Sequence, residues 1–361
     1  MNNFYDVAIL GLGAMGSTAA RFLSRRGRSV IAFDSHMPPH DLGSSHGRTR
    51  MIREAYFEHP VYVHMVRRAY ELWRDMEHES GGRTFFRRTG GLMIGPEAGT
   101  LFQGTLRSAV ENRIPHEVLS SGKLHRRFPA LAPLDDMMAV FETRAGILYP
   151  DQIIAANLEF AKRRGADLHT GEGVVAWEPT ADGVDVRTAR GTYRAKQLVI
   201  SVGSRAPELL HDLSLPLQVE RQVSHWMEPS RFPEYFAPDR MPVSLWELPS
   251  GGSFYTIPDL GEGMKVGLHH GGTVTTPDAI SRTVTHSEDS AVFDLLRRFV
   301  PFGKGEILDR AVCMYTNTPD RHFVIDRHPR HEAVIVVSAC SGHGFKFAPA
   351  IAEWVADVVE G

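Results

Sequence analysis

Two continuous runs of apolar residues, one near each end of this 361-residue chain, are each followed by a glycine-rich segment. Residues 7–10 read Val-Ala-Ile-Leu and predict a buried parallel strand, because a strand covered on both faces shows no polar alternation. Residues 14–26 then predict a helix, and residues 29–33 predict a second strand. Near the other end, the apolar run 333–337 predicts a strand that leads through small residues into a last helix over 348–359.

Between these ends, the spacing of apolar residues predicts further helices and strands. The predicted helices cover residues 61–77, 97–112, 121–127, 150–164 (with Asp151 as its cap) and 288–299. A hairpin is predicted over 84–95 through Gly90 and Gly91, and strands are predicted over 197–202, 217–223, 243–246, 253–257 and 264–268. The last four strands alternate apolar and polar residues, which is typical of antiparallel strands with one covered face.

The first glycine-rich segment, Gly-Leu-Gly-Ala-Met-Gly, has the spacing of a dinucleotide-binding turn. Gly11 allows the tight turn, Gly13 lets the backbone approach a pyrophosphate, and Gly16 lets the helix lie close to the strand. Asp34 ends the second strand about 20 residues further on, where it can bond a ribose hydroxyl and would repel the 2′-phosphate of NADP. The pattern does not separate NAD from FAD. A second glycine-rich turn at the opposite end of the chain favours a flavin nucleotide, bound at its phosphates by the first turn and at its ring by the second.

We therefore predict an α/β fold with two domains, which a chain of this length can form. One is a FAD-binding Rossmann-like domain of the glutathione-reductase type, expected to be discontinuous over residues 1–90, 145–215 and 310–361. The other is an antiparallel-sheet substrate domain, expected over residues 91–144 and 216–309.

Composition and charge disfavour several other classes of protein. The net charge of −3 gives no bulk attraction to nucleic acid or membrane, and no apolar run approaches the ~20 residues of a membrane span. The first predicted strand begins almost at the N-terminus, which leaves no room for a signal peptide, and two cysteines fit a reducing compartment. We expect a cytoplasmic protein. The 18 histidines lack a zinc-binding spacing, so no metal is expected.

Two segments are candidate anion sites. The loop over residues 43–56 carries three arginines within six residues, and guanidinium groups match the geometry of carboxylate and phosphate. A solvated basic loop is the simpler alternative. The segment 341–346, Ser-Gly-His-Gly-Phe-Lys, opens the last helix, whose N-terminal N–H groups and Lys346 would stabilise an anionic reduced flavin ring.

Two further residue types remain ambiguous on spacing alone. Lys265 and His269 share one face of a predicted strand, and that face is either exposed to solvent or lines a cavity. Cys313 lies in an apolar strand, where a lone cysteine is usually an inert core residue.

Five segments together resemble the monomeric sarcosine oxidase and N-methyltryptophan oxidase family, a group within the D-amino-acid-oxidase-like flavoproteins. The resemblance follows nearly the whole chain in order. It is carried by residues 34–40, 44–56, 313–316, 323–326 and 341–347.

The resemblance implies a role for individual residues. Cys313 matches a cysteine that carries FAD covalently through a thioether to the 8α-methyl group. Arg53 and Lys346 match the pair that binds the substrate carboxylate. Lys265 matches a lysine that assists oxygen reduction, where a fixed cation would stabilise superoxide, and Arg50 matches an arginine beside the flavin ring.

The remaining expected site residues line the substrate cavity or contact the cofactor. His269 and Tyr315 are expected in the catalytic group with Lys265 and Arg50, while Tyr255 and Leu245 align with the cavity wall. The expected cofactor contacts are Gly11, Gly13, Gly16, Asp34, Ser44, Thr49, Arg50, Cys313, Gly342, His343, Gly344, Phe345 and Lys346.

The activity that the resemblance implies is that of a monomeric FAD-dependent amine oxidase acting on a CH–NH bond with O2 as acceptor. Sarcosine is the expected substrate, giving formaldehyde, glycine and hydrogen peroxide. The alternatives are an oxidase of a larger N-substituted amino acid, a cyclic imino acid or a fructosyl amino acid. A dehydrogenase that avoids oxygen, an NAD(P)-dependent dehydrogenase and a non-catalytic flavin-binding protein also stay open.

The chain departs from the family pattern at several positions, and these leave the substrate more open than the flavin. Ser45 and Arg48 stand where relatives often have His and Asp, and Ser204-Arg205 replaces Ala-Trp. The chain ends at Gly361, where family members continue with a short tail, which we interpret as a truncated or naturally short form.

Overall fold

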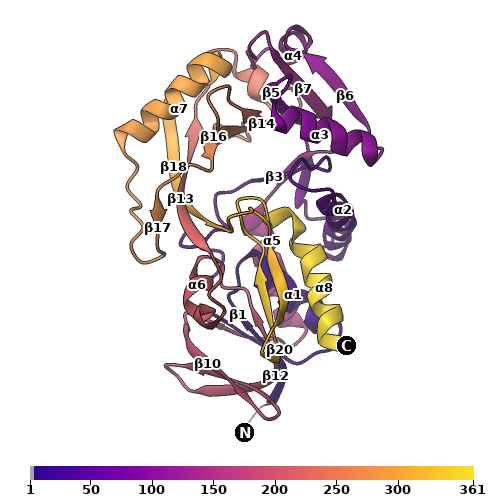
Figure 1. The fold of residues 1–361 in the computed structure, drawn as a ribbon, viewed down its shortest axis with the longest axis vertical. Coiled ribbons are helices and arrows are strands. Elements are labelled where there is room, and N and C mark those ends of the chain that lie inside the picture. Colours follow the sequence, from indigo (N-terminus) through magenta and orange to yellow (C-terminus); the bar gives the residue numbers. More distant parts are fainter. Residues whose placement is uncertain (1–3) are drawn as a thin grey trace.

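The computed structural model describes residues 4–361, and a largely parallel sheet forms its lower half in Figure 1. The strand order is β10 (Val174–Thr180), β11 (Gly183–Thr188), β12 (Thr192–Ile200), β1 (Phe4–Leu10), β2 (Val30–Asp34) and β9 (Asp167–Thr170). Beside this path, β20 (His331–Ser338) pairs in parallel with β12 and carries β19 (Val324–His328). The two ends of the chain therefore contribute strands to one sheet.

Burial on both faces explains the unbroken apolar run in β1. Val7 and Ile9 pack into a core shared with the helices, whereas Ala8 and Leu10 pack into a second core with residues of β11 and β12. The helices of the first core are α1 (Ala14–Arg25), α2 (Val61–Glu79), α5 (Pro150–Arg163) and α8 (Ala348–Glu360).

A second, mostly antiparallel sheet forms the upper half of the molecule in Figure 1. Its order is β17 (Val274–Thr275), β13 (Gln218–Met227), β16 (Met264–His269), β15 (Ser253–Ile257), β14 (Val243–Glu247), β5 (Gly91–Pro96), β7 (Met137–Glu142) and β6 (His116–Ser120), and β18 (Ile307–Asn317) pairs with β13. Its helices are α3 (Thr100–Glu111), α4 (Ser121–Arg127) and α7 (His286–Phe299).

The structure also contains a small third sheet and a short helix. A small sheet with the order β3 (Arg50–Ile52), β8 (Gly146–Leu148) and β4 (Phe86–Arg88) joins the loop after β2 to the two larger sheets. The short helix α6 (Ala206–Leu209) follows β12.

The predicted α/β class, with a Rossmann-like sheet and an antiparallel sheet, is confirmed, but two local predictions are wrong. The segment 84–95 is not a hairpin, because β4 pairs with β8 and β5 pairs with β7 and β14. Asp151 does not cap α5: Tyr149 holds the cap position, and Pro150, with its fixed φ, takes the first helical position and moves Asp151 inside the first turn. The domain boundaries stay a prediction.

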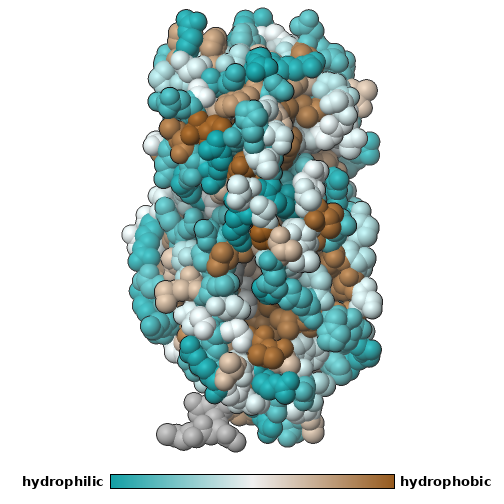
Figure 2. All heavy atoms as spheres, turned by 90° about the vertical axis from the view of Figure 1, so that its left-hand side faces the viewer, coloured by the Kyte–Doolittle hydropathy of each residue, from teal (hydrophilic) through white to brown (hydrophobic). Residues whose placement is uncertain are grey.

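The surface carries scattered rather than continuous apolar groups on the face shown in Figure 2, where brown residues are separated by hydrophilic ones. Within residues 4–361, no helix combines the length and apolar character that crossing a membrane requires. In the same part of the chain, no three His, Cys, Asp or Glu side chains are grouped so that they could hold a metal ion.

Glu142, at the end of β7, connects the antiparallel sheet to the loop after β3. Its carboxylate accepts hydrogen bonds from the backbone N–H of Glu54 (2.8 and 3.0 Å) and of Ala55 (2.8 Å). Burial raises the pKa of Glu142 to about 7. Because Arg53 immediately precedes these two residues, Glu142 helps to fix the backbone that carries it.

We expect Glu142→Ala to destabilise the fold by about 2–6 kcal/mol, because two buried N–H groups lose their acceptor at about 1–3 kcal/mol each. Thermal unfolding should show a lower midpoint, with Glu142→Gln intermediate because one acceptor oxygen remains. The matched control is Glu117→Ala, which removes an exposed ion pair with Arg127 and should change stability by no more than about 0.5 kcal/mol. An unchanged midpoint for Glu142→Ala would contradict this role.

Candidate active site

A cavity of about 610 Å³ takes its lining from both large sheets and from the loop after β2. Every predicted site residue except Gly16 lines it. Gly16 instead packs against the first turn, where a Cβ would lie 1.7 Å from the carbonyl oxygen of Gly11. The structure thus brings together residues that are more than 300 positions apart in the sequence, such as Gly13 and Lys346.

The first glycine turn has the conformation that a phosphate site needs. Gly11 adopts a φ of +85°, which favours glycine, and Gly13 caps α1 without a side chain. Asp34 at the end of β2 accepts a hydrogen bond from Leu12 N (2.8 Å). Burial raises the pKa of Asp34, but hydrogen bonds from His40 and from backbone N–H groups outweigh it, so the net shift is downward and the carboxylate is ionised.

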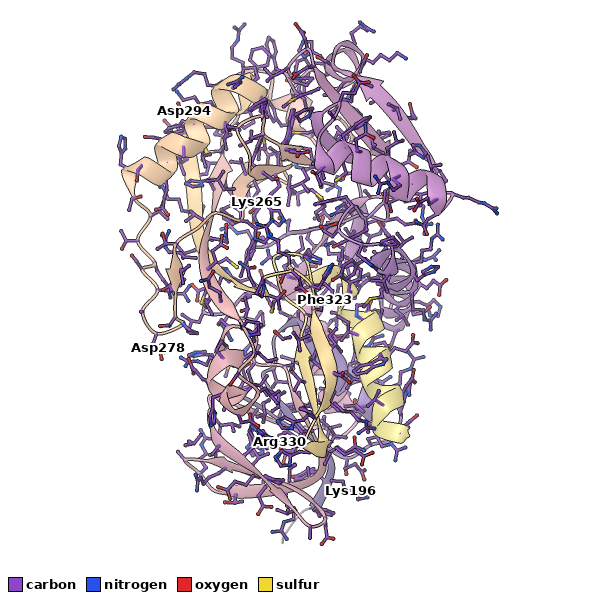
Figure 3. All side chains as sticks on the ribbon, viewed as in Figure 1. Lys196, Lys265, Asp278, Asp294, Phe323 and Arg330 are labelled. Atoms are coloured by element: carbon purple, nitrogen blue, oxygen red, sulfur yellow. The ribbon has the colours of Figure 1, made fainter. Side chains whose placement is uncertain are left out.

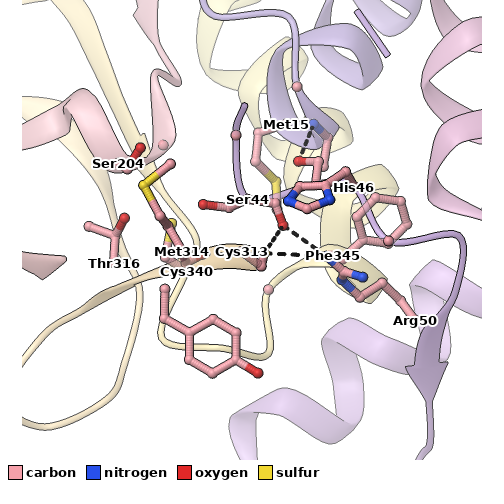
Figure 4. Close-up of a pocket in the computed structure, with 18 of the residues that line it drawn as sticks. Met15, Ser44, His46, Arg50, Ser204, Cys313, Met314, Thr316, Cys340 and Phe345 are labelled. Carbon is pink, nitrogen blue, oxygen red and sulfur yellow. Dashed lines mark hydrogen bonds between the residues drawn. The ribbon is translucent and has the colours of Figure 1, made fainter. Parts of the chain in front are cut away.

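Cys313, on β18, lies against the loop after β2 (Figure 4). Its Sγ is 3.5 Å from the carbonyl oxygen of Ser44 and 3.9 Å from Nη2 of Arg50. Arg50 also donates to the carbonyl oxygens of Thr49 and Ser44, each at 2.9 Å. The cysteine is 8 % exposed but lines the cavity, so its thiol is not enclosed in an apolar core.

Lys265, on β16, is 3 % exposed and lies in the middle of the molecule, as labelled in Figure 3. Its Nζ donates to the carbonyl oxygens of Gly47 (2.7 Å) and Thr49 (3.4 Å) and lies 5.0 Å from the ring centroid of Trp226. Burial, reinforced by the charge of Arg50, lowers the pKa of Lys265 well below its ordinary value. The face of the strand that carries Lys265 and His269 therefore lines a cavity and is not exposed to solvent.

Arg53 and Lys346 meet at the ring of Tyr56. The Cζ of Arg53 lies 4.0 Å from the ring centroid and the Nζ of Lys346 lies 5.3 Å from it. Arg53 donates to both carboxylate oxygens of Glu58, at 2.8 and 2.9 Å. Burial and the nearby Arg53 lower the pKa of Lys346 to about 7, against the opposing charge of Glu58. The alternative of a solvated basic loop is wrong for Arg53, which is 3 % exposed.

The cavity walls near these cations are aromatic and apolar. His269 Nδ1 lies 3.2 Å from the hydroxyl of Tyr315, and burial lowers the pKa of His269 well below its ordinary value, so its imidazole is neutral. The hydroxyl of Tyr255 lies 2.8 Å from Ser224 Oγ. Leu245 packs on Met93 and Leu101 in a small apolar cluster, which makes this wall unable to solvate charge.

The second glycine turn fits tightly under these side chains. A Cβ on Gly342 would lie 2.7 Å from the ring of Tyr315 and 3.1 Å from that of His269, and one on Gly344 would lie 1.8 Å from the carbonyl oxygen of Ala339. Phe345 stacks on Trp73 with 5° between their ring planes. Glycine is therefore required at both positions for the backbone to reach the cavity.

Several polar atoms of the cavity wall are arranged to receive a ligand. Within the described part of the chain, Ser44 Oγ, His46 Nε2 and Thr49 Oγ1 are buried without a hydrogen-bond partner. Leaving such groups unsatisfied costs about 1–3 kcal/mol each. FAD carries ring, ribitol and phosphate groups that could pair with them, and the cavity is lined by both glycine turns, which suits a dinucleotide of this kind. The residues present therefore fit FAD.

Two residues beside Arg53 and Lys346 were not predicted from the sequence. Glu58 binds Arg53 directly, and Tyr56 contacts both Arg53 and Lys346. Tyr56 lies in the arginine-rich loop, so its position near the site was readable from the sequence, but no spacing indicates a contact with a residue 290 positions away. His46 was also missed. Burial, with Arg50 and Lys265, lowers its pKa to about 4.

Comparison with known proteins agrees with this geometry. Residues 6–358 match the family described as DAO, FAD dependent oxidoreductase. The chain is 44 % identical over 362 residues to monomeric sarcosine oxidase of Streptomyces avermitilis, covering 99 % of this chain and 94 % of that protein. It is 34 % identical over 358 residues to N-methyl-L-tryptophan oxidase of Escherichia coli K12, covering 99 % and 95 %.

Among solved structures, the open form of NikD, an unusual amino acid oxidase of nikkomycin biosynthesis, is similar in fold, with a TM-score of 0.85 at 23 % identity. The match covers 99 % of this chain and 94 % of NikD. The family match over nearly the whole chain, together with the two glycine turns and the cavity they enclose, shows that this protein belongs to the DAO family of FAD-dependent oxidoreductases.

Proposed function

We propose that this protein is an FAD-dependent oxidase of N-methyl amino acids, with sarcosine as its substrate. The overall reaction consumes sarcosine, O2 and H2O and yields glycine, formaldehyde and H2O2. We further propose that it acts as a monomer in the cytoplasm, without nucleic-acid or membrane partners. The two relatives above are named monomeric sarcosine oxidase and N-methyl-L-tryptophan oxidase, and sarcosine is itself an N-methyl amino acid. Their names support the substrate class.

The observation that carries the proposal is the pair of buried cations at one end of the cavity. Arg53 and Lys346 present a guanidinium and an ammonium group around Tyr56, an arrangement suited to one carboxylate. The Arg53 guanidinium donates to both carboxylate oxygens of Glu58, which supports the affinity of this group for a carboxylate. A substrate carboxylate held here would leave its amine and N-methyl group directed toward the rest of the cavity.

The surrounding charges favour the neutral amine. Lys265, Arg50, Arg53 and Lys346 all lie along the cavity, and His269 is neutral. Positive charge in a poorly solvated site disfavours a substrate ammonium group, so the bound amine loses its proton more readily than in water. The neutral amine is the form that can give up a hydride equivalent to an acceptor.

FAD would be held by the first glycine turn and Asp34 at its phosphates and ribose, and by the loop 44–50 and the segment 342–346 at its ring. When bound, it supplies the two-electron acceptor that O2 regenerates. We propose that Cys313 carries it covalently, since the thiol lines the cavity beside Arg50 and Ser44. We propose that Lys265 stabilises the negative charge that develops on oxygen, because its ammonium group is fixed by two carbonyl oxygens.

Anaerobic titration with a substrate panel tests the proposal. We expect sarcosine to bleach the flavin absorbance of the purified protein most efficiently, compared with N-methyl-L-tryptophan, L-proline and fructosyl glycine. Acetate, which has a carboxylate but no oxidisable amine, serves as the control and should leave the flavin oxidised. Preferential bleaching by another member of the panel would reassign the substrate, and no bleaching by any of them would overturn the proposed activity.

Covalent attachment is tested by denaturation. Wild-type protein should keep its yellow colour in the precipitate after acid treatment, whereas Cys313→Ser should release all of its flavin to the supernatant. The matched control is Cys340→Ser, because Cys340 lines the same cavity and should not affect attachment. Complete release of flavin from the wild type would show that the cofactor is not covalently bound.

The role of Lys265 is tested by separating the two half-reactions. Lys265→Met should slow reoxidation of the reduced enzyme by O2 by roughly 10²-fold while leaving anaerobic reduction by substrate nearly unchanged, because only the former develops charge on oxygen. Lys196→Met is the control, since Lys196 is an exposed lysine paired with Asp6 far from the cavity (Figure 3). Equal reoxidation rates for Lys265→Met and the wild type in stopped-flow measurements would remove Lys265 from the oxygen reaction.

A further inference from the structure

A chain of hydrogen bonds runs from the ammonium group of Lys346 to a backbone carbonyl group behind the cavity. Lys346 Nζ lies 2.9 Å from the hydroxyl of Tyr56, which lies 3.1 Å from Nδ1 of His343. The other ring nitrogen of His343, Nε2, lies 3.0 Å from the carbonyl oxygen of Arg321. Each partner in this chain can be assigned as donor or acceptor from its chemistry.

The carbonyl of Arg321 determines the direction of the whole chain. A carbonyl oxygen can only accept, so Nε2 of His343 must carry a hydrogen. Burial lowers the pKa of His343 to about 4, so the ring is neutral at physiological pH and Nδ1 has a free lone pair. The ring is held in this orientation by Phe323, whose centroid is 4.6 Å away, and by Tyr62 at 5.2 Å.

The hydroxyl of Tyr56 must then donate to Nδ1 of His343. Burial raises the pKa of Tyr56 well above its ordinary value, so the hydroxyl keeps its hydrogen. Because the hydrogen of this hydroxyl points at His343, the Tyr56 oxygen can only accept a hydrogen bond from Lys346. Lys346 Nζ also donates to the carbonyl oxygen of His343, at 2.8 Å.

An ammonium group has three N–H donors, and two of those of Lys346 are thus directed at fixed acceptors. Within residues 4–361, these are the acceptors that the ammonium contacts, and the side chain lines the cavity. We propose that Tyr56 and His343 are positioning residues that hold Lys346 in its charged form with one N–H aimed at the substrate carboxylate. This inference rests on the proposed function, because it deepens the account of the same carboxylate site.

Lys346 titrates in the accessible pH range. Glu142, whose pKa burial raises to about 7, titrates there too, but it bonds the N–H groups of Glu54 and Ala55 rather than Lys346 and is the same in the wild type and in every variant compared. Burial, assisted by the charges of Arg53 and Arg50, lowers the pKa of Lys346 to about 7, and Glu58 opposes the shift. The other groups that face it keep one charge state between about pH 6 and 9, because their pKa values are moved out of this range. The pKa values of His269, His343 and Glu58 are lowered, and those of Arg53, Tyr56 and Tyr62 are raised.

The affinity of the site for a carboxylate should therefore depend on pH. A charged Lys346 binds carboxylate, so affinity should fall as the pH rises above about 7. Removing the Tyr56 hydroxyl removes an acceptor that stabilises the charged form, so the loss of affinity should begin at lower pH. A purely structural effect of the substitution would instead weaken binding by the same factor at every pH.

The test measures the Kd of acetate for the flavin-loaded enzyme by calorimetry between about pH 6 and 9, where acetate stays ionised. We expect Tyr56→Phe to weaken binding about tenfold or more at pH 8 and markedly less at pH 6, as expected for a lost hydrogen bond to a charged group. The matched control is Tyr62→Phe, which removes a hydroxyl bonded to His322 in the same aromatic cluster. It should bind acetate within about twofold of the wild type at each pH.

A double-mutant cycle shows whether Tyr56 acts through Lys346. In a Lys346→Met background, Tyr56→Phe should cause no further loss of affinity. His343→Leu, which removes the ring acceptor and supplies no other, should reproduce the pH-dependent loss and provides a second variant if Tyr56→Phe yields no flavin-loaded protein.

The possible outcomes separate this inference from the proposed function. If the wild type does not bind acetate at any pH tested, both the carboxylate site and the positioning role are overturned. If the wild type binds acetate but Tyr56→Phe behaves like Tyr62→Phe, or is equally damaging in the Lys346→Met background, only the positioning role is overturned.

Discussion

The concentration of positive charge in one poorly solvated cavity is the constraint on which this site depends. Arg50, Arg53, Lys265 and Lys346 all line it, and each is held by a backbone carbonyl oxygen. The carbonyl groups belong to Ser44, Gly47, Thr49, Ala55 and His343. A carbonyl dipole satisfies an N–H donor without supplying a net negative charge. The loop after β2 thus supplies main-chain oxygens to Arg50 and Lys265, and the second glycine turn supplies one to Lys346.

This arrangement leaves the cavity electrostatically incomplete without an anion. The pKa values of Lys265 and Lys346 are lowered by burial and then by the arginine nearest to each. An anion entering the cavity reverses that effect, so its binding and the protonation of the lysines favour each other. Glu58 balances part of the charge through Arg53. In the proposed function, this charge selects for a carboxylate, and the apolar wall around Leu245 limits the size of the substrate.

The parts of the molecule that depend on short-range spacing were predictable from the sequence. Gly11 and Asp34 could be assigned because a strand, a turn and a helix in sequence order determine where they lie, and the resemblance to a known family placed the residues near both ends of the cavity. The contacts that depend on long-range pairing were not predictable. The strand after Phe85 finds its partner in β8, about 60 residues further on, so the hairpin was wrong. The pairing of Glu58 with Arg53 also has no signature, since a loop can direct a carboxylate to any neighbour.

The register of β13 links Cys313 and Lys265, two residues that line the cavity from the strands on either side of β13. Gln222 of this strand is opposite Cys313 on β18, and Trp226 is opposite Lys265 on β16. The sulfur atom and the ammonium group are therefore attached to one continuous hydrogen-bonded ladder, and they can shift relative to each other only if that ladder is broken. On the other side of the cavity, Arg53 is carried by a loop whose backbone is tied to β7 through Glu142. A change in the pairing of β13 would therefore displace the sulfur atom and the ammonium group together, whereas the loop that carries Arg53 would keep its attachment to β7.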